Sequence, residues 1–237
     1  SGRKRVLLEL GGNAALIVHS DWPELDEVAA RTAQGAFGYA GQSCISVQRV
    51  FVERPIFQTF LTMVAEHTKT LVSGNPQDDA TDLGPLIRQS DVERVESWIK
   101  EAVEGGAQLI AGGGCKGSMI EPTILTGTKP GMKVRDEEVF GPVVTIEPYD
   151  DYEEALAEVN HSKYGLQAGL LTRDAGRILT AYRELEIGAL IVGDTPNWRL
   201  DPMPYGGVKE SGLGREGIRF ALEEMTEPRM LVMTGIG

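Results

Sequence analysis

Short apolar runs rich in β-branched residues alternate along this chain with longer segments whose apolar residues recur every three to four positions. Runs of the first kind are typical of buried strands, and segments of the second kind are typical of amphipathic helices. Strands are expected at 15–18, 47–53, 107–111, 143–149, 167–172 and 189–192. Helices are expected at 25–37, 57–71, 92–103, 153–160, 175–186 and 216–225. This alternation predicts an α/β fold with a largely parallel sheet and flanking helices.

The composition favours a globular protein that binds neither nucleic acid nor membrane. The chain has 237 residues, 41% of them hydrophobic, and a formal net charge of −12. A nucleic-acid-binding surface needs a basic patch to replace the counterions of the phosphates, and the sequence has none. No apolar stretch approaches the roughly 20 residues of a membrane span. Two cysteines make no disulfide framework, so we expect a cytoplasmic location.

Cys44 lies in a stretch that suits a nucleophile. In GYAGQSCISVQRV, residues 38–50, it stands between a predicted helix and a predicted strand, after the small or polar residues 41–43. A nucleophilic thiol needs an approachable sulfur and nearby backbone N–H groups that can hold an oxyanion. A free cysteine usually packs as a small hydrophobic residue instead. On spacing alone, both interpretations of Cys44 stand.

Glu9 is a carboxylate inside an apolar run, LELGGNAALIV at residues 7–17, and two glycines follow it closely. Apolar surroundings raise the pKa of a carboxyl group, which would make Glu9 a better general base. The alternative is a structural ion pair with one of the basic residues 3–5. By itself, the position of Glu9 favours the ion pair.

The chain also has three histidines, the usual partners of a catalytic thiol. His67 lies on a predicted helix among charged residues, whereas His19 ends a predicted strand and His161 follows a helix end. None lies in a local protease signature, but catalytic groups assemble in space, so a Cys–His hydrolase is an alternative. No His/Cys pair has the spacing of metal ligands, and no metal site is predicted.

Two further stretches are candidates for binding loops. RDEEVFGPVV, residues 135–144, places Glu138 and Phe140 before a Gly-Pro corner. MPYGGVKESGLGREG, residues 203–217, contains five glycines together with Tyr205. Glycine density of this order indicates a backbone that folds tightly around something.

Together these stretches resemble the aldehyde dehydrogenase family. The family's glutamate motif matches LELGGN, its cysteine motif matches GQSC, and EEVFGP and PYGGVKESGLGREG match two further signatures in the same order. The resemblance extends from about Leu8 to Met233. It implies oxidation of an aldehyde to a carboxylic acid with NAD or NADP.

The resemblance also implies a role for each residue singled out above. Cys44 would attack the aldehyde to give a thiohemiacetal, hydride transfer would leave a thioester, and Glu9 would activate the water that hydrolyses it. Glu138 would bind the nicotinamide ribose, and Phe140 would pack beside the nicotinamide. Tyr205 would form an aromatic wall of the substrate site.

Members of this family are about twice as long as the chain, which implies a C-terminal catalytic half. Residues 1–13 would be the tail of a cofactor-binding domain, residues 14–225 the catalytic domain, and residues 226–237 an oligomerisation strand and tail. The run RMLVM, residues 229–233, would pair as an edge strand with another chain in a homodimer or tetramer. The preceding half would hold the Rossmann-type fold, the adenosine site and an asparagine that completes the oxyanion hole.

The stretch GDTPNWRLDPMPYGG, residues 193–207, resembles a subgroup that oxidises small polar or anionic aldehydes, such as lactaldehyde, succinate semialdehyde or phosphonoacetaldehyde. Arg199 would pair with the anion as a fork-shaped donor, and a solvated surface arginine is the alternative. One departure from the family is Asn13, where a lysine is common. Two other hypotheses are a thiol hydrolase or esterase built on Cys44, and a non-catalytic assembly module.

We predict that this chain alone makes little or no NADH or NADPH from an aldehyde and the oxidised cofactor. Most of the cofactor site would lie in the preceding half. The measurement is cofactor reduction by the purified chain, and robust reduction would contradict the expected division of the site.

Overall fold

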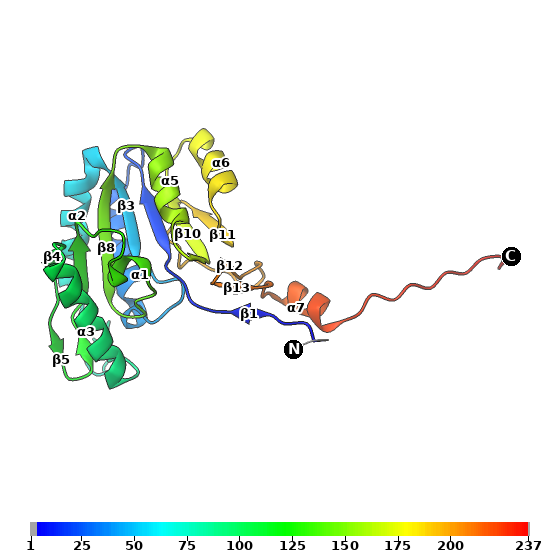
Figure 1. The fold of residues 1–237 in the computed structure, drawn as a ribbon, viewed down its shortest axis with the longest axis horizontal. Helices are drawn as coiled ribbons and strands as arrows, with labels where there is room; N and C mark the ends of the chain where they lie inside the picture. Colours follow the sequence, from blue (N-terminus) through cyan, green and yellow to red (C-terminus); the bar gives the residue numbers. More distant parts are fainter. Residues whose placement is uncertain (1–3, 237) are drawn as a thin grey trace.

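A seven-stranded sheet in the order β11-β10-β2-β3-β8-β7-β4 forms the centre of the fold (Figure 1). The computed structural model describes residues 4–236. The strands are β2 (Ala15–Val18), β3 (Arg49–Glu53), β4 (Gln108–Ala111), β7 (Thr123–Thr126), β8 (Val143–Tyr149), β10 (Gln167–Leu171) and β11 (Ala189–Val192). Neighbouring strands pair in parallel except at the edge, where β4 runs antiparallel to β7. The predicted α/β fold with a largely parallel sheet is confirmed.

Helices cover both faces of this sheet. The helices α1 (Leu25–Phe37) and α2 (Arg54–Lys69) pack on one face, and α3 (Gln89–Glu104), α5 (Tyr152–Asn160) and α6 (Ala175–Glu184) pack on the other. Leu16 and Val18 of β2 contact the α1–α2 layer, whereas Ala15 and Ile17 contact the α5–α6 layer. Because successive side chains of a strand point to opposite faces, a strand covered on both sides reads as one continuous apolar run.

Three small two-stranded sheets and two further helices complete the elements. β1 (Leu8–Glu9) pairs with β13 (Gly212–Leu213), β9 (Tyr164–Gly165) with β12 (Val208–Lys209), and β5 (Cys115–Lys116) with β6 (Met119–Ile120). The helices are α4 (Lys133–Asp136) and α7 (Ile218–Met225), and a 3-10 turn covers Gly38–Gly41. The β1–β13 pair joins the N-terminal segment to the glycine-rich stretch near the C-terminus.

The predicted elements are found with ends shifted by a few residues, and one strand of the central sheet was missed. The missed strand is β7, only four residues long and buried throughout. The helix expected from residue 57 begins at Arg54, with Pro55 in its first turn, where a missing N–H has no cost.

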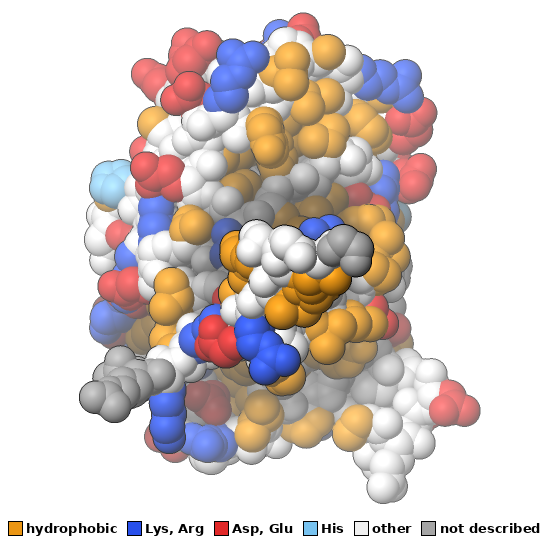
Figure 2. All heavy atoms as spheres, turned by 90° about the vertical axis from the view of Figure 1, so that its right-hand side faces the viewer, with side chains coloured by type: hydrophobic (Ala, Val, Ile, Leu, Met, Phe, Trp, Pro, Cys, Tyr) orange, Lys and Arg blue, Asp and Glu red, His pale blue; other side chains and the backbone are white. Residues whose placement is uncertain are grey.

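The C-terminal segment differs from its prediction. Residues 226–236 form no helix or strand and extend away from the sheet (Figure 1), so the strand expected at 229–233 is not formed within this chain. Figure 2 faces this end of the molecule and shows hydrophobic side chains gathered there. The exposed ones include Ile218, Leu222, Met225, Met230, Leu231, Val232 and Met233. Pairing with another chain stays a prediction, and residues 1–3 and 237 of the predicted domains lie outside the described residues.

None of the helices in the described part of the chain is both long and apolar enough to cross a membrane.

Candidate active site

The candidate residues gather where three adjacent parallel strands begin. Glu9 precedes β2, Cys44 precedes β3 and Glu138 precedes β8, and these strands are neighbours in the order β2-β3-β8. The amino ends of parallel strands meet at one edge of a sheet, so segments far apart in sequence come together there. Glu9, Cys44, Glu138 and Phe140 line an open groove of about 430 Å³ at this edge.

The loop that carries Cys44 is tightly folded. Tyr39, Ala40 and Gly41 have φ values of 54°, 55° and 69°, in the left-handed region that side chains disfavour. A Cβ on Gly41 would lie 2.1 Å from the carbonyl oxygen of Gly141, so this glycine lets the loop reach the EEVFGP stretch. The left-handed turn therefore brings the loop that carries Cys44 into contact with the EEVFGP stretch.

The two glycines after Glu9 make equally close approaches. A Cβ on Gly12 would lie 1.9 Å from the carbonyl oxygen of Cys44, and one on Gly11 would lie 2.6 Å from Oε2 of Glu138. The Gly12 N–H also donates to Oε1 of Glu138 at 2.8 Å. The glutamate, cysteine and EEVFGP motifs are thus in direct contact.

Glu9 is a partly buried carboxylate without an ion pair in the described chain. Its Oε1 atom is buried and has no hydrogen-bond partner within residues 4–236. Burial raises the pKa of Glu9 and nearby Glu216 raises it further, against lowering by the Cys44, Arg199 and Tyr205 side chains. Arg5 instead pairs with Glu227 at 2.9 Å, so among the described basic residues the alternative of a structural ion pair is not realised. A carboxylate with a raised pKa can accept a proton more readily, as a general base must.

The Cys44 sulfur lies 3.0 Å from the hydroxyl oxygen of Tyr205. Burial raises the pKa of the Cys44 thiol, the Tyr205 hydroxyl lowers it, and Glu9 and Glu138 raise it. A raised pKa favours the protonated thiol, so this sulfur needs a base to become a nucleophile. The backbone N–H of Cys44 has no acceptor among the described residues, which leaves it available to an oxyanion.

Tyr205 and Arg199 form one packed unit beside the thiol. The Arg199 guanidinium carbon lies 4.0 Å from the centroid of the Tyr205 ring, and Nη2 lies 3.1 Å from Oε2 of Glu216. Arg199 is therefore held in place and is not simply a solvated surface residue. Tyr205 is only 2% exposed. It therefore meets Cys44 with its hydroxyl group and not with an open aromatic face.

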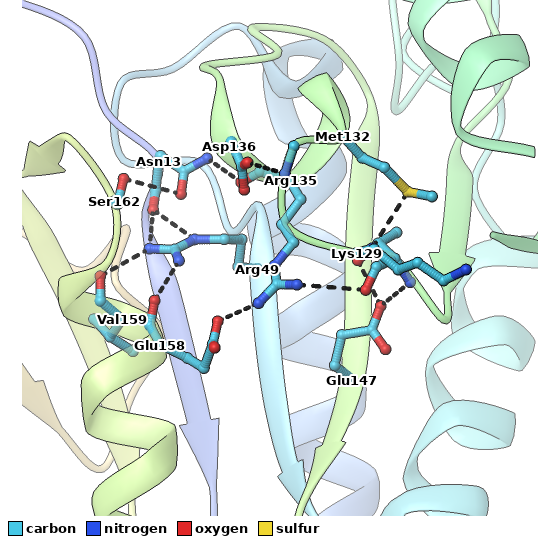
Figure 3. A network of polar contacts seen from close by, with 12 residues as sticks. Asn13, Arg49, Lys129, Met132, Arg135, Asp136, Glu147, Glu158, Val159 and Ser162 are labelled. Atoms are coloured by element: carbon cyan, nitrogen blue, oxygen red, sulfur yellow. Dashed lines mark hydrogen bonds and ion pairs between the residues drawn. The ribbon is translucent and has the colours of Figure 1, made fainter. Parts of the chain in front are cut away.

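Asn13 fixes the segment behind Glu9 (Figure 3). Its side-chain amide donates to the backbone carbonyls of Arg135 at 2.9 Å and Glu137 at 3.1 Å. The backbone carbonyl of Asn13 accepts a hydrogen bond from Arg49. These bonds tie the segment to the stretch that ends in Glu138. They also show what the asparagine does at a position where the family often has lysine.

Gln48 and Arg49 were not among the residues predicted for the site. Arg49 donates to the backbone carbonyls of Asn13, Glu158 and Val159, and Gln48 donates to the carbonyl of Glu137 at 2.7 Å (Figure 3 shows the Arg49 contacts). Both are buried polar residues in an otherwise apolar run. Polar residues in such a run could have indicated buried hydrogen bonds at this position.

The histidines lie elsewhere in the described structure, and none is among the groups that contact Cys44. His19 is buried at the carboxyl end of β2, with Nδ1 3.1 Å from Oε2 of Glu53. His67 pairs with Asp26 at 2.9 Å, and His161 lines a separate cavity beside Arg49. No cluster of three metal-ligating residues occurs within residues 4–236. The Cys–His arrangement of a thiol hydrolase is not formed by the described residues.

A thiol, a carboxylate of raised pKa and a backbone N–H without an acceptor in the described chain lie on one groove, and groups of these kinds are suited to covalent chemistry on sulfur. The sequence profile of the aldehyde dehydrogenase family matches residues 1–231, and the chain belongs to this family.

Individual relatives agree with this assignment. The chain is 51% identical over 233 residues to a 3-sulfolactaldehyde dehydrogenase of Priestia aryabhattai, covering 98% of this chain and 49% of the relative. Aldehyde dehydrogenase 21 of Physcomitrella patens, solved with the reaction product succinate, superposes with a TM-score of 0.96 at 41% identity, over 100% of this chain and 49% of that one. A glyceraldehyde-3-phosphate dehydrogenase of Methanocaldococcus jannaschii, solved with NADP, has a TM-score of 0.91 at 38% identity and coverages of 94% and 48%. The chain spans about half the length of the curated relatives it matches.

We predict that Gly12→Ala destabilises the fold by roughly 1–3 kcal/mol, because the added methyl group collides with the Cys44 carbonyl. Urea denaturation measures the change. Gly38→Ala is the matched control, since no atom lies within 4 Å of the added carbon, and it should change stability by less than about 0.5 kcal/mol. Equal effects of the two substitutions would contradict the close approach at Gly12.

Proposed function

We propose that this chain is the catalytic half of an NAD(P)-dependent aldehyde dehydrogenase that acts on a small anionic aldehyde. The observation that carries the proposal is the Cys44 thiol placed between the Glu9 carboxylate and the Tyr205 hydroxyl, on the groove that also holds Glu138. A family assignment alone would support the reaction class. This constellation supports the roles of the individual residues.

The first half of the mechanism is acylation of Cys44. Glu9 takes the thiol proton, and the thiolate attacks the aldehyde carbon to form a thiohemiacetal oxyanion. The backbone N–H of Cys44 donates to this oxyanion, because no protein acceptor among the described residues occupies it. Loss of hydride from the same carbon restores the carbonyl group and leaves a thioester on Cys44.

The second half is hydrolysis of the thioester. Glu9 first releases the thiol proton to solvent. It then accepts a proton from water, and the hydroxide adds to the thioester carbon. The C–S bond then breaks, the electron pair returns to sulfur, and the carboxylic acid leaves. A carboxylate whose pKa is raised by burial suits this step, because a stronger base takes the proton of water more readily.

The groove has groups that fit the nicotinamide end of the cofactor. Glu138 uses Oε1 to accept from Gly12, while Oε2 accepts no hydrogen bond within the described chain and suits the hydroxyl groups of a ribose. Phe140, with φ of 45°, is partly exposed on the same groove and suits contact with a flat ring. When bound, NAD(P)+ supplies the acceptor for the hydride.

Arg199 supports an anionic substrate. Its side chain is 39% exposed and is anchored by Glu216 and the Tyr205 ring, so it presents donors near Tyr205 and Glu9 from a fixed position. The three relatives named above refer to a sulfonate, a carboxylate and a phosphate compound. A planar guanidinium binds each of these anions in the same forked manner.

We expect Glu9→Gln to slow both halves of the reaction, because neither the Cys44 thiol nor the water then has its base. In the full-length protein, aldehyde turnover should fall by roughly 10²–10⁴-fold. The thioester that does form should persist, and mass spectrometry should show it as one acyl group on Cys44. Cys44→Ala is the control and should show no adduct. Normal turnover in Glu9→Gln, or loss of turnover on replacing a histidine, would favour the thiol hydrolase instead.

We expect Arg199→Gln to raise the KM for anionic aldehydes by roughly tenfold or more, as a lost hydrogen bond to a charged group implies. A neutral aldehyde of similar length serves as the matched substrate, and its KM should change little. An unchanged KM for the anionic aldehyde would refute the role of Arg199 in substrate selection.

A further inference from the structure

We infer that Tyr205 is a catalytic hydrogen-bond donor that stabilises the Cys44 sulfur whenever that sulfur carries negative charge. The inference rests on the proposed function for its place in the reaction, but its geometry stands by itself. The Tyr205 hydroxyl oxygen lies 3.0 Å from Sγ of Cys44. No histidine is among the groups that contact this sulfur in the described structure, so the phenol occupies the place of the usual imidazole.

The direction of this hydrogen bond follows from the surroundings of the two groups. Tyr205 is almost fully buried, and burial raises the pKa of its hydroxyl, so the O–H group keeps its proton at any working pH. A thiolate has no proton to donate. Once Glu9 has removed the thiol proton, the phenol is therefore the donor and sulfur the acceptor.

Packing fixes the phenol in this position. The Tyr205 ring packs with Ile45 and Leu166 on the buried side, and Arg199 covers it at 4.0 Å from the ring centroid. The backbone of Tyr205 exchanges two hydrogen bonds with that of Glu216, at 3.1 and 2.6 Å. A cation above the ring also draws electron density from it, which makes the hydroxyl a better donor.

Two moments of the reaction place negative charge on sulfur. The first comes when Glu9 removes the thiol proton, and the second when the C–S bond of the hydrated thioester breaks and its electron pair moves to sulfur. In both, Tyr205 donates a hydrogen bond and keeps its proton, so the proton balance of the mechanism is unchanged. A hydrogen bond that strengthens as charge develops lowers the barrier of each step.

The test is the pH dependence of iodoacetamide alkylation at Cys44 in this chain, resolved by peptide mass spectrometry. Tyr205→Phe keeps the ring and removes the hydroxyl. We expect the midpoint of the Cys44 profile to rise by about one pH unit, since a hydrogen bond to a charged group contributes about that much. At neutral pH, alkylation should slow about tenfold, while the rates of variant and unaltered chain converge at high pH.

The matched control is Tyr149→Phe. Tyr149 is also buried, and its hydroxyl has no partner in the described chain, at the opposite edge of the sheet from Cys44. It should leave the Cys44 profile unchanged. A purely structural role of Tyr205 would change the alkylation rate by the same factor at every pH, and that result, or no change at all, would overturn the inference.

A second variant covers the case in which Tyr205→Phe does not fold. Incorporation of 3-fluorotyrosine at position 205 keeps the hydroxyl and makes it more acidic, so the midpoint should move down. A midpoint that stays in place would also overturn the inference. Aldehyde oxidation by the full-length protein is measured separately, so failure of the donor role with activity retained is distinct from failure of the proposed function.

Discussion

The site depends on backbone approaches that leave no room for a side chain. The Gly12 backbone lies against the Cys44 carbonyl, and the Gly41 backbone lies against the Gly141 carbonyl. These contacts bring three loops into one cluster without intervening side chains, so the distances between Glu9, Cys44 and Glu138 follow from main-chain packing. Main-chain packing is stiffer than contact between long side chains, and a stiff frame is what preorganised catalysis requires.

Some buried polar groups near the site are hydrogen-bonded to the described part of the protein, whereas one oxygen of Glu9 is not. The Asn13–Arg49 network is almost fully hydrogen-bonded, which makes buried charge tolerable and fixes the segment behind Glu9. Glu9 itself has a buried oxygen without a partner in the described chain, and its pKa is raised. A buried carboxylate oxygen without a hydrogen-bond partner is a cost to stability. Sites that keep such a cost commonly do so because the reaction uses it.

Elements with a clear apolar pattern were predicted from the sequence. Elements and contacts that depend on tertiary packing were missed. The strand at 15–18 was found because burial on both faces makes it continuously apolar. The four-residue strand β7, with two threonines, gave too short an apolar signal, although it is fully buried. Family motifs singled out Glu9, Cys44, Glu138 and Tyr205. They did not indicate that the Tyr205 hydroxyl meets the sulfur of Cys44, because that contact joins residues far apart in the sequence and depends on how the chain folds between them.

The edge of the sheet that carries the site also follows from particular residues. In open parallel sheets, ligands usually bind beyond the carboxyl ends of the strands. Here side chains fill that edge: His19 after β2, Glu53 at the end of β3 and Tyr149 at the end of β8 lie together, and His19 is within 3.1 Å of Glu53. The loops at the amino ends are the glycine-rich ones, and glycine there lets the three loops pack closely against one another. The groove beside Cys44 therefore lies at the amino ends, where the loops before β2, β3 and β8 meet.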